Sequence, residues 1–199
     1  MKRILSGTFV LALILGGAFR AQAQAPAPAD SKPAAAPAAK NIRTAFLDDL
    51  KDEQEKIVGL AEAFPADKFT WRPAGDVRSV SETFLHLATA NFGFPNAWGV
   101  KPPEGLDLRG LAKSTTDKAK VIAVVKQSYD HIRNAVSNLS DADLEKRVQF
   151  FGGEETIGGI LFHTANHQHE HLGQLIAYAR MNGVVPPWTA ARAAAKPAH

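Results

Sequence analysis

The fold is decided by one stretch near the C-terminus, Gly158-Gly-Ile-Leu-Phe-His163-Thr-Ala-Asn-His167-Gln-His169-Glu-His171-Leu-Gly-Gln174-Leu-Ile-Ala-Tyr-Ala-Arg180. Apolar side chains recur through it at helical spacing, and alanine and glutamine fill much of the rest. The apolar positions are Leu161, Leu172, Leu175, Ile176 and Tyr178. The stretch also holds four of the chain's seven histidines. It is therefore predicted to form one helix that carries a concentration of imidazole groups.

Histidines four residues apart lie on one face of a helix, one above the other. This spacing aligns His163, His167 and His171, and Gln174 follows them on the same face. A row of imidazoles offers nitrogen ligands to a divalent metal. His163 and His171 lie roughly 12 Å apart along the axis, which is too far to share one ion. The metal pair is therefore His163 with His167 or His167 with His171. A helix with scattered surface histidines is the alternative without a metal.

The remaining histidine of the stretch does not complete a known zinc motif. His169 points away from the row, and Gly173 stands where the pattern H-E-x-x-H needs its second histidine after His169-Glu170. A third ligand from elsewhere in the chain would decide between a metal site and a surface helix.

The first 25 residues have the pattern of a secretory signal peptide. A short basic start, Lys2-Arg3, precedes an apolar run over residues 4–19, and Ala21-Gln-Ala is a small-x-small cleavage site. The apolar run is short for a membrane-spanning helix. The mature protein is therefore expected to be periplasmic or secreted, with no membrane anchor after cleavage of the signal.

The segment that follows, residues 26–40, is rich in alanine and proline. Its prolines forbid a continuous helix, and it offers no large apolar side chain to bury. We predict a disordered tether between the signal peptide and the folded domain.

Removal of the signal peptide leaves a chain without net charge. The whole sequence has 23 basic and 20 acidic residues, and the segment 1–25 contains Lys2, Arg3 and Arg20 but no acid. The mature chain thus has 20 of each, and its charge gives no indication of a nucleic-acid partner. The sequence contains no cysteine, which excludes disulfides and a lipoprotein anchor. Stability must therefore come from a hydrophobic core.

Residues 41–188 are long enough for one domain with such a core. Apolar periodicity predicts four long helices separated by loops rich in proline and glycine. The helices cover about 41–64, 80–92, 115–138 and the quoted stretch, with Thr115 or Thr116 as the cap of the third. In the first helix the charged residues, Glu53 among them, are assigned to faces away from the core.

Shorter features complete the prediction. Residues 148–151 are predicted as a brief extended segment. Gly183 is expected to end the last helix in a left-handed conformation, because glycine pays no steric cost there. Residues 189–199 are expected to be a flexible tail.

The second helix begins with a capping box, Ser79 at the N-cap and Glu82 three residues later. The helix is apolar on nearly all sides, so it should be buried, and His86 lies in its middle. A lone histidine there is usually a core residue with hydrogen-bond partners. Because a histidine row exists elsewhere in the chain, His86 is instead predicted to share a metal with His167 and His171.

This pattern of helices and histidines resembles the DinB superfamily of metal-binding four-helix bundles. The matching segments are Trp71-Arg-Pro, Arg78-Ser-Val-Ser-Glu-Thr-Phe-Leu-His86-Leu, Asn166-His167-Gln-His-Glu-His171-Leu-Gly-Gln174-Leu and Arg180-Met-Asn-Gly-Val-Val-Pro-Pro-Trp188. The resemblance implies an all-α fold, an up-down four-helix bundle, with zinc or nickel held by three histidines near one end. By motif the ligands are His86, His167 and His171, which leaves His163 without an assigned role. Many relatives have arginine where this chain has Leu172.

Two polar residues near the ligands are candidates for catalysis. Gln174 lies one turn beyond His171 and is placed to orient a ligand or bind substrate, although a plain polar helix position explains it equally well. Glu82 lies one turn before His86, where a carboxylate can support a ligand or act as a general base. Since Glu82 also completes the capping box, the structural role is preferred.

Three neutral imidazoles leave a metal dipositive with an open position, as in catalytic zinc sites. The resemblance implies either metal-dependent hydrolysis or transfer and isomerisation reactions that use small thiols such as mycothiol or bacillithiol. Those thiols are cytosolic, so export favours metal-activated water acting on an unknown small molecule.

The remaining alternative is a non-catalytic envelope protein that binds or senses a metal. A homodimer formed through the helices is considered as an arrangement for it. An open pocket lined by Phe84, Phe92, Trp98 or Phe162 would favour small-molecule chemistry, and a filled one would favour a structural or sensing role.

Overall fold

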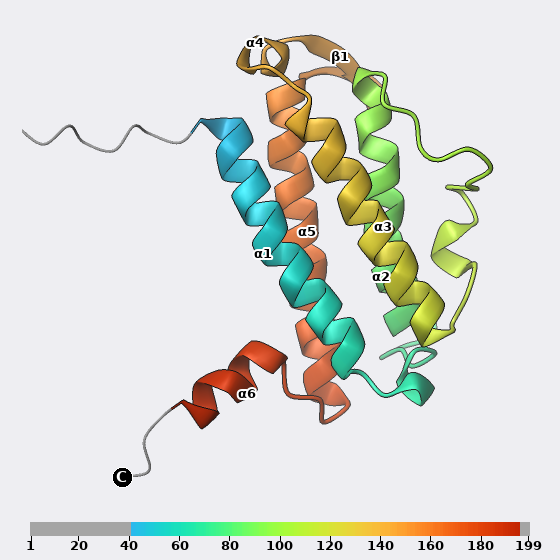
Figure 1. The fold of residues 1–199 in the computed structure, drawn as a ribbon. Coiled ribbons are helices and arrows are strands. Elements are labelled where there is room, and N and C mark those ends of the chain that lie inside the picture. Colours follow the sequence, from blue (N-terminus) through green and yellow to red (C-terminus); the bar gives the residue numbers. More distant parts are fainter. Residues whose placement is uncertain (1–40, 196–199) are drawn as a thin grey trace, which may run out of the picture. The chain divides into compact units, whose positions relative to one another are not determined.

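Four long helices dominate the computed structural model, which describes residues 41–195 (Figure 1). They are α1 (Ile42–Ala63), α2 (Val80–Gly93), α3 (Lys118–Ser137) and α5 (Ile157–Met181). The all-α four-helix bundle expected from the sequence is confirmed. The predicted signal peptide (1–25), the predicted tether (26–40) and residues 196–199 lie outside the described residues.

Each long helix packs against two of the others, α1 against α3 and α5, and α2 against the same two. The connection between α2 and α3 runs along the length of the bundle, so these two helices point the same way (Figure 1). Hydrogen bonds fix the opposite direction for α1: Lys118 at the start of α3 donates to the Phe64 carbonyl, and Arg43 donates to the Leu139 carbonyl at the other end. The helices therefore run up, down, down, up, and α2 lies antiparallel to α5.

The core fills the space between the four helices. Its largest completely buried side chains come from all of them and from the loop after α1, and they include Phe64, Phe69, Phe84, Tyr129, Ile132 and Leu161. Phe84 is packed between two other rings, edge-on to Phe64 and stacked on Phe69, with centroid distances of 6.2 Å in both cases. Burying one such side chain stabilises the fold by about 1.5–3 kcal/mol.

The first residues of the long helices are stabilised by N-cap side chains that accept hydrogen bonds from backbone amides. Ser79 and Glu82 form the predicted capping box, with the Ser79 amide donating to the Glu82 carboxylate over 2.8 Å. The third helix is capped by Asp117, which accepts from the Lys120 amide at 2.9 Å. The expected caps, Thr115 and Thr116, lie two residues and one residue before it. Aspartate is among the strongest N-cap residues, so the local chemistry accounts for the shift.

Short elements join the long helices. They are the 3₁₀ turns η1 (Ala66–Lys68), η2 (Phe94–Trp98) and η3 (Leu111–Lys113), the one-turn helix α4 (Asp141–Leu144), and the strands β1 (Arg147–Phe150) and β2 (Gly153–Thr156). The extended segment predicted around residue 148 is β1, and it pairs with β2 in an antiparallel hairpin that the sequence analysis did not anticipate. The hairpin lies at the end of the bundle where α5 begins (Figure 1).

The C-terminal end of α5 has the predicted stop, since Gly183 has φ 72° and the Val184 amide returns to the Ala179 carbonyl at 2.8 Å. Beyond it, α6 (Pro187–Ala194) is a helix where a flexible tail was expected from residue 189. Proline at the first helical position and a run of alanines explain this difference. Within residues 41–195, no helix is long and apolar enough to cross a membrane.

One assignment in α1 needs correction. Glu53 was placed on a solvent face, but its exposed fraction is 0 %, and it points into the bundle between α1 and its neighbours. Apolar periodicity identified most of the buried face of α1, but Ile42 at its start is 59 % exposed and the buried carboxylate of Glu53 was missed.

Candidate metal centre

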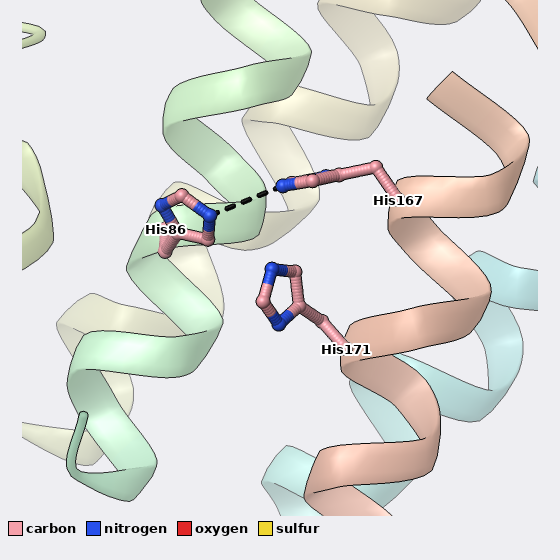
Figure 2. A group of neighbouring side chains, drawn as sticks. All are labelled: His86, His167 and His171. Carbon is pink, nitrogen blue, oxygen red and sulfur yellow. Dashed lines mark hydrogen bonds between the residues drawn. The ribbon is translucent and has the colours of Figure 1, made fainter. Parts of the chain in front are cut away.

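Three imidazoles meet between the antiparallel helices α2 and α5 (Figure 2). His86 projects from the middle of α2, and His167 and His171 project from successive turns of α5. The Nε2 atoms of His86 and His167 are 3.1 Å apart, and the ring centroids of all three lie 4.6–5.0 Å from one another. The three residues predicted as ligands are thus brought together, each with a nitrogen within 4.8 Å of the others.

A chain of hydrogen bonds fixes the orientation of His171. Its Nδ1 lies 2.8 Å from Oε1 of Gln174, whose amide nitrogen lies 2.7 Å from the Tyr178 hydroxyl. That hydroxyl donates to the Arg78 carbonyl at 3.1 Å. Because the Gln174 oxygen accepts a hydrogen bond, Nδ1 of His171 carries the proton and Nε2 keeps its lone pair for the space shared with His86 and His167. An outer hydrogen-bond partner of this kind is typical of metal-ligating histidines.

Two of the three imidazoles, those of His86 and His167, stay neutral far below neutral pH. Burial lowers the pKa of His86 to about 4, with smaller contributions from the Arg78 charge and from His171. Burial also lowers the pKa of His167 to about 3, followed by the effects of His171 and His86. Neutral imidazoles are the form that binds a metal. Because burial keeps the His86 and His167 rings unprotonated, their nitrogen lone pairs are free to bind a cation.

The donor set fits a divalent cation. Nitrogens bound at about 2.0–2.1 Å to one tetrahedral ion lie roughly 3.3 Å apart, close to the 3.1 Å between His86 and His167. Nδ1 of His167 is buried and has no hydrogen-bond partner among the described residues, and its Nε2 faces only another imidazole. A cation between the two rings would take the place of this Nε2–Nε2 contact and accept a lone pair from each nitrogen.

A cavity of about 610 Å³ lies beside two of the three imidazoles, His86 and His167. Its wall is mostly apolar and is formed by α2, η2, the loop between η2 and η3, the hairpin and α5. Among its residues are Ala90, Phe94, Leu108, Phe150, Phe151 and His163. The open pocket expected for small-molecule chemistry is present, but the expected lining residues were wrong.

The four aromatic residues expected to line the pocket lie elsewhere in the fold. Phe84 and Phe92 are buried in the core, and the half-buried Trp98 packs against that core. Phe162 is 71 % exposed and lies beside α1, away from the cavity. The sequence showed where apolar residues are frequent but not which of them face the site.

His163 belongs to the cavity wall and not to the ligand group. Its ring lies 6.5 Å from that of His167 and contacts three phenylalanines, with centroid distances of 5.3–5.7 Å to Phe94, Phe150 and Phe151. The row His163–His167–His171 therefore divides between a metal pair and a residue of the adjoining pocket.

The hairpin places an unusual residue at the edge of this cavity. Phe151 and Gly152 form its two-residue loop with φ 48° and 81°, the positive values of a type I′ turn. Such a loop favours Asn-Gly, and a bulky side chain at positive φ costs roughly 1–2 kcal/mol. Phe151 is nevertheless 77 % exposed and lines the cavity. Strain of this kind commonly marks a position kept for binding.

Glu82, the other predicted catalytic candidate, is held by its capping contacts. Its carboxylate accepts from the Ser79 amide and pairs with Arg72 at 3.1 Å. The Ser79 hydrogen bond lowers the pKa of Glu82, burial opposes this, and Arg72 adds to the lowering. The contacts agree with the preferred structural role, and a catalytic role stays a prediction. Tyr178, which supports Gln174, was not recognised from the sequence as part of the site.

The fold and the three-imidazole group together define a helical bundle that could bind a metal ion. Comparison with known families identifies it further: the DinB superfamily matches over residues 49–175, more than half of the 199 residues. The chain belongs to the DinB superfamily, which confirms the resemblance seen in the sequence.

Solved structures share the fold. A DinB-like protein from Bacillus cereus ATCC 10987 is 20 % identical, with a TM-score of 0.63 over 71 % of this chain and 93 % of its own. A DinB-like protein from Bacillus subtilis is also 20 % identical, with the same coverage and a TM-score of 0.57. A conserved protein from Enterococcus faecalis is 14 % identical, with a TM-score of 0.59 over 71 % of this chain and 97 % of its own. No curated protein matches the chain significantly.

Replacing Gln174 tests the support of His171. In Gln174→Ala the Nδ1 proton of His171 loses its acceptor, and zinc affinity is expected to fall about 10–100-fold. Competition with a chromophoric chelator measures the change. Gln127→Ala, an exposed glutamine of α3, serves as the control. Equal affinity in the two variants would show that Gln174 does not support the ligand.

The lowered imidazole pKa values predict an acid-sensitive apoprotein. Below pH 6.5 the unfolded chain binds protons on His86 and His167, whereas the folded chain does so only near pH 4 and pH 3. The free energy of unfolding in EDTA is therefore expected to fall as pH drops from 6.5 toward 4. Urea unfolding at pH 7 and pH 5 measures this loss, and it should be smaller in the double variant His86→Ala/His167→Ala. The same loss in both proteins would contradict the prediction.

Proposed function

We propose that this protein is a metal-dependent hydrolase for a small molecule with an apolar or aromatic part. The observation that carries the proposal is the cavity of about 610 Å³, which is walled by aromatic rings and shares His86 and His167 with the imidazole group. A metal site used only for structure has no need of such a space. Closed structural sites use all their ligand positions, whereas three protein ligands leave one open.

When bound, a divalent cation supplies Lewis-acid activation of a water or of a carbonyl group. The chain's own residues do the rest. Gln174 holds the His171 ring in its ligating orientation. The rings of Phe94 and Phe150 exclude water from the cavity and bind the apolar part of the substrate. Arg78, whose charge reaches His86 and His167, favours the negative charge that develops during hydrolysis.

His163 is positioned to exchange a proton with the substrate. It faces the cavity beside His167 but is not one of the three ligands. An imidazole that faces a bound substrate can accept or donate a proton through either ring nitrogen, as general acid–base catalysis requires. We therefore assign proton transfer to His163, a residue whose role the sequence left open.

Zinc and nickel are the proposed metals, because neutral imidazoles suit both. Export through the predicted signal peptide is part of the proposal. It favours hydrolysis over a thiol-dependent transferase reaction, since small thiols such as mycothiol and bacillithiol are cytosolic. Water is present in every compartment.

Metal content and hydrolysis, measured on the same preparations, test the proposal. The untagged mature protein is expected to contain about one equivalent of zinc or nickel at this site and to hydrolyse some member of a panel of aromatic esters, amides and lactones. His171→Ala should lose the metal and the activity, because one of three ligands is removed. His163→Ala should keep the metal and lose most of the turnover.

Three outcomes would contradict this assignment. A folded protein without metal removes the basis of the chemistry. Metal without any hydrolysis favours the non-catalytic bundle. Turnover that requires an added thiol favours the transferase. Equal turnover in His163→Ala and the wild type would remove only the role given to His163.

Phe151 offers a separate test of the cavity. Phe151→Asn should raise the free energy of unfolding by up to about 1 kcal/mol, because asparagine tolerates positive φ. The same change removes an aromatic wall and should weaken binding of 1-anilinonaphthalene-8-sulfonate severalfold. Urea unfolding and fluorescence titration measure the two effects. Phe162→Asn, an exposed ring of α5 outside the cavity, should leave dye binding unchanged. Unaltered dye binding in Phe151→Asn would exclude Phe151 from the ligand pocket.

A further inference from the structure

A second group of ligating side chains lies on another face of α5, where this helix packs against α1. Asp49 and Glu53 are one turn apart on α1, and His169 reaches them from α5. Nε2 of His169 lies 3.1 Å from both carboxylate oxygens of Asp49, and its Nδ1 lies 3.4 Å from Oε1 of Glu53. One ligand atom from each of the three residues lies within 4.8 Å of the other two.

Glu53 is the unusual member of this group. Its side chain is completely buried, and its Oε2 has no hydrogen-bond partner among the described residues. Lys56 contacts the other oxygen at 3.1 Å. Tyr129 is buried nearby, but its hydroxyl donates to Gln168 and not to Glu53. A buried carboxylate oxygen without a partner is costly, and proteins usually satisfy one by pairing it or by coordinating a metal.

Charge points the same way. Two carboxylates face the His169 ring, and among the described residues Lys56 is the only lysine or arginine that forms an ion pair with either of them. A divalent cation would be attracted by both carboxylates and would give the orphaned oxygen of Glu53 a partner. The three-imidazole centre is different, because it contains no carboxylate and attracts a metal through nitrogen lone pairs alone.

We propose that Asp49, Glu53 and His169 form a second divalent-cation site, which joins α1 to α5. The donor set of two carboxylates and one imidazole is harder than that of the three-imidazole centre, and it suits Mn²⁺ or Zn²⁺. Ligand atoms held at about 2.0–2.2 Å lie up to roughly 4.4 Å apart, so small side-chain movements assemble the site. Asp49 and His169 are partly accessible, which gives the ion a route of entry.

The site would have a mechanical consequence for the bundle. α1 and α5 are packed side by side, and the cation would connect them through His169, which lies two residues from His167 and from His171 on another face of α5. Binding to the folded chain alone stabilises that chain. The second site is therefore structural and does not depend on the proposed hydrolase reaction.

Zinc titration in a His167→Ala background separates the two sites. This background lacks one ligand of the first centre, so any remaining stoichiometric binding measured by calorimetry belongs elsewhere. We expect one equivalent, and we expect its affinity to fall at least tenfold when Asp49→Asn or His169→Ala is added. Asp52→Asn removes the same charge from an exposed position of α1 and should leave the affinity unchanged.

Thermal unfolding of the same proteins gives a second readout. Zinc should raise the melting temperature of the His167→Ala protein and of its Asp52→Asn derivative, but not that of the Asp49→Asn derivative. Glu53→Gln keeps the shape of the buried side chain and should also abolish the shift. Circular dichroism first checks that the Asp49→Asn derivative is folded. The proposal is overturned if the His167→Ala protein binds no zinc, or if its Asp49→Asn derivative binds zinc as tightly as its Asp52→Asn derivative.

Discussion

The close contact between α2 and α5 is the constraint on which the site depends. Two imidazole nitrogens approach to 3.1 Å across this contact, which two protonated rings would not tolerate. Burial solves the problem by keeping both rings neutral. The capping box at Ser79 sets where α2 begins, and the apolar residues on its other sides hold it in the bundle. The position of His86 opposite His167 therefore follows from how α2 is capped and packed.

Successive residues of α5 serve different neighbours, which explains why one helix carries so much polar chemistry. His167 and His171 face α2, and His169 faces α1. Gln168, completely buried between them, donates to Asn91 of α2 and accepts from Tyr129 of α3. Because α5 packs against α1 and α2 and its Gln168 also reaches Tyr129 of α3, each of its buried polar groups must find a partner on one of these helices. This requirement fixes the rotation of α5 about its axis and so aims its ligands.

The sequence predicted the features that depend on spacing along one helix. The four long helices, the capping box and the grouping of the three histidines could be read from periodicity and motif. Features that depend on contacts between distant segments could not. The burial of Glu53, the parallel course of α2 and α3, and the identity of the cavity wall all arise from packing. Phe94 and Phe151 lie in loop segments of the sequence, and no local pattern indicates that their rings meet. They line the same cavity because η2 and the hairpin are both packed beside the start of α5.

One physical property links the metal centre to the cavity. Removing water from His86 and His167 lowers their pKa values and leaves their lone pairs free for a cation. The same removal of water is achieved by aromatic side chains, and these side chains also make the cavity suitable for an apolar ligand. A more polar wall would raise the pKa values of His86 and His167 toward the ordinary value for histidine, and protons would then compete with a metal at acidic pH. A metal and an apolar ligand would therefore depend on the same residues, and a change in the wall is expected to alter the binding of both.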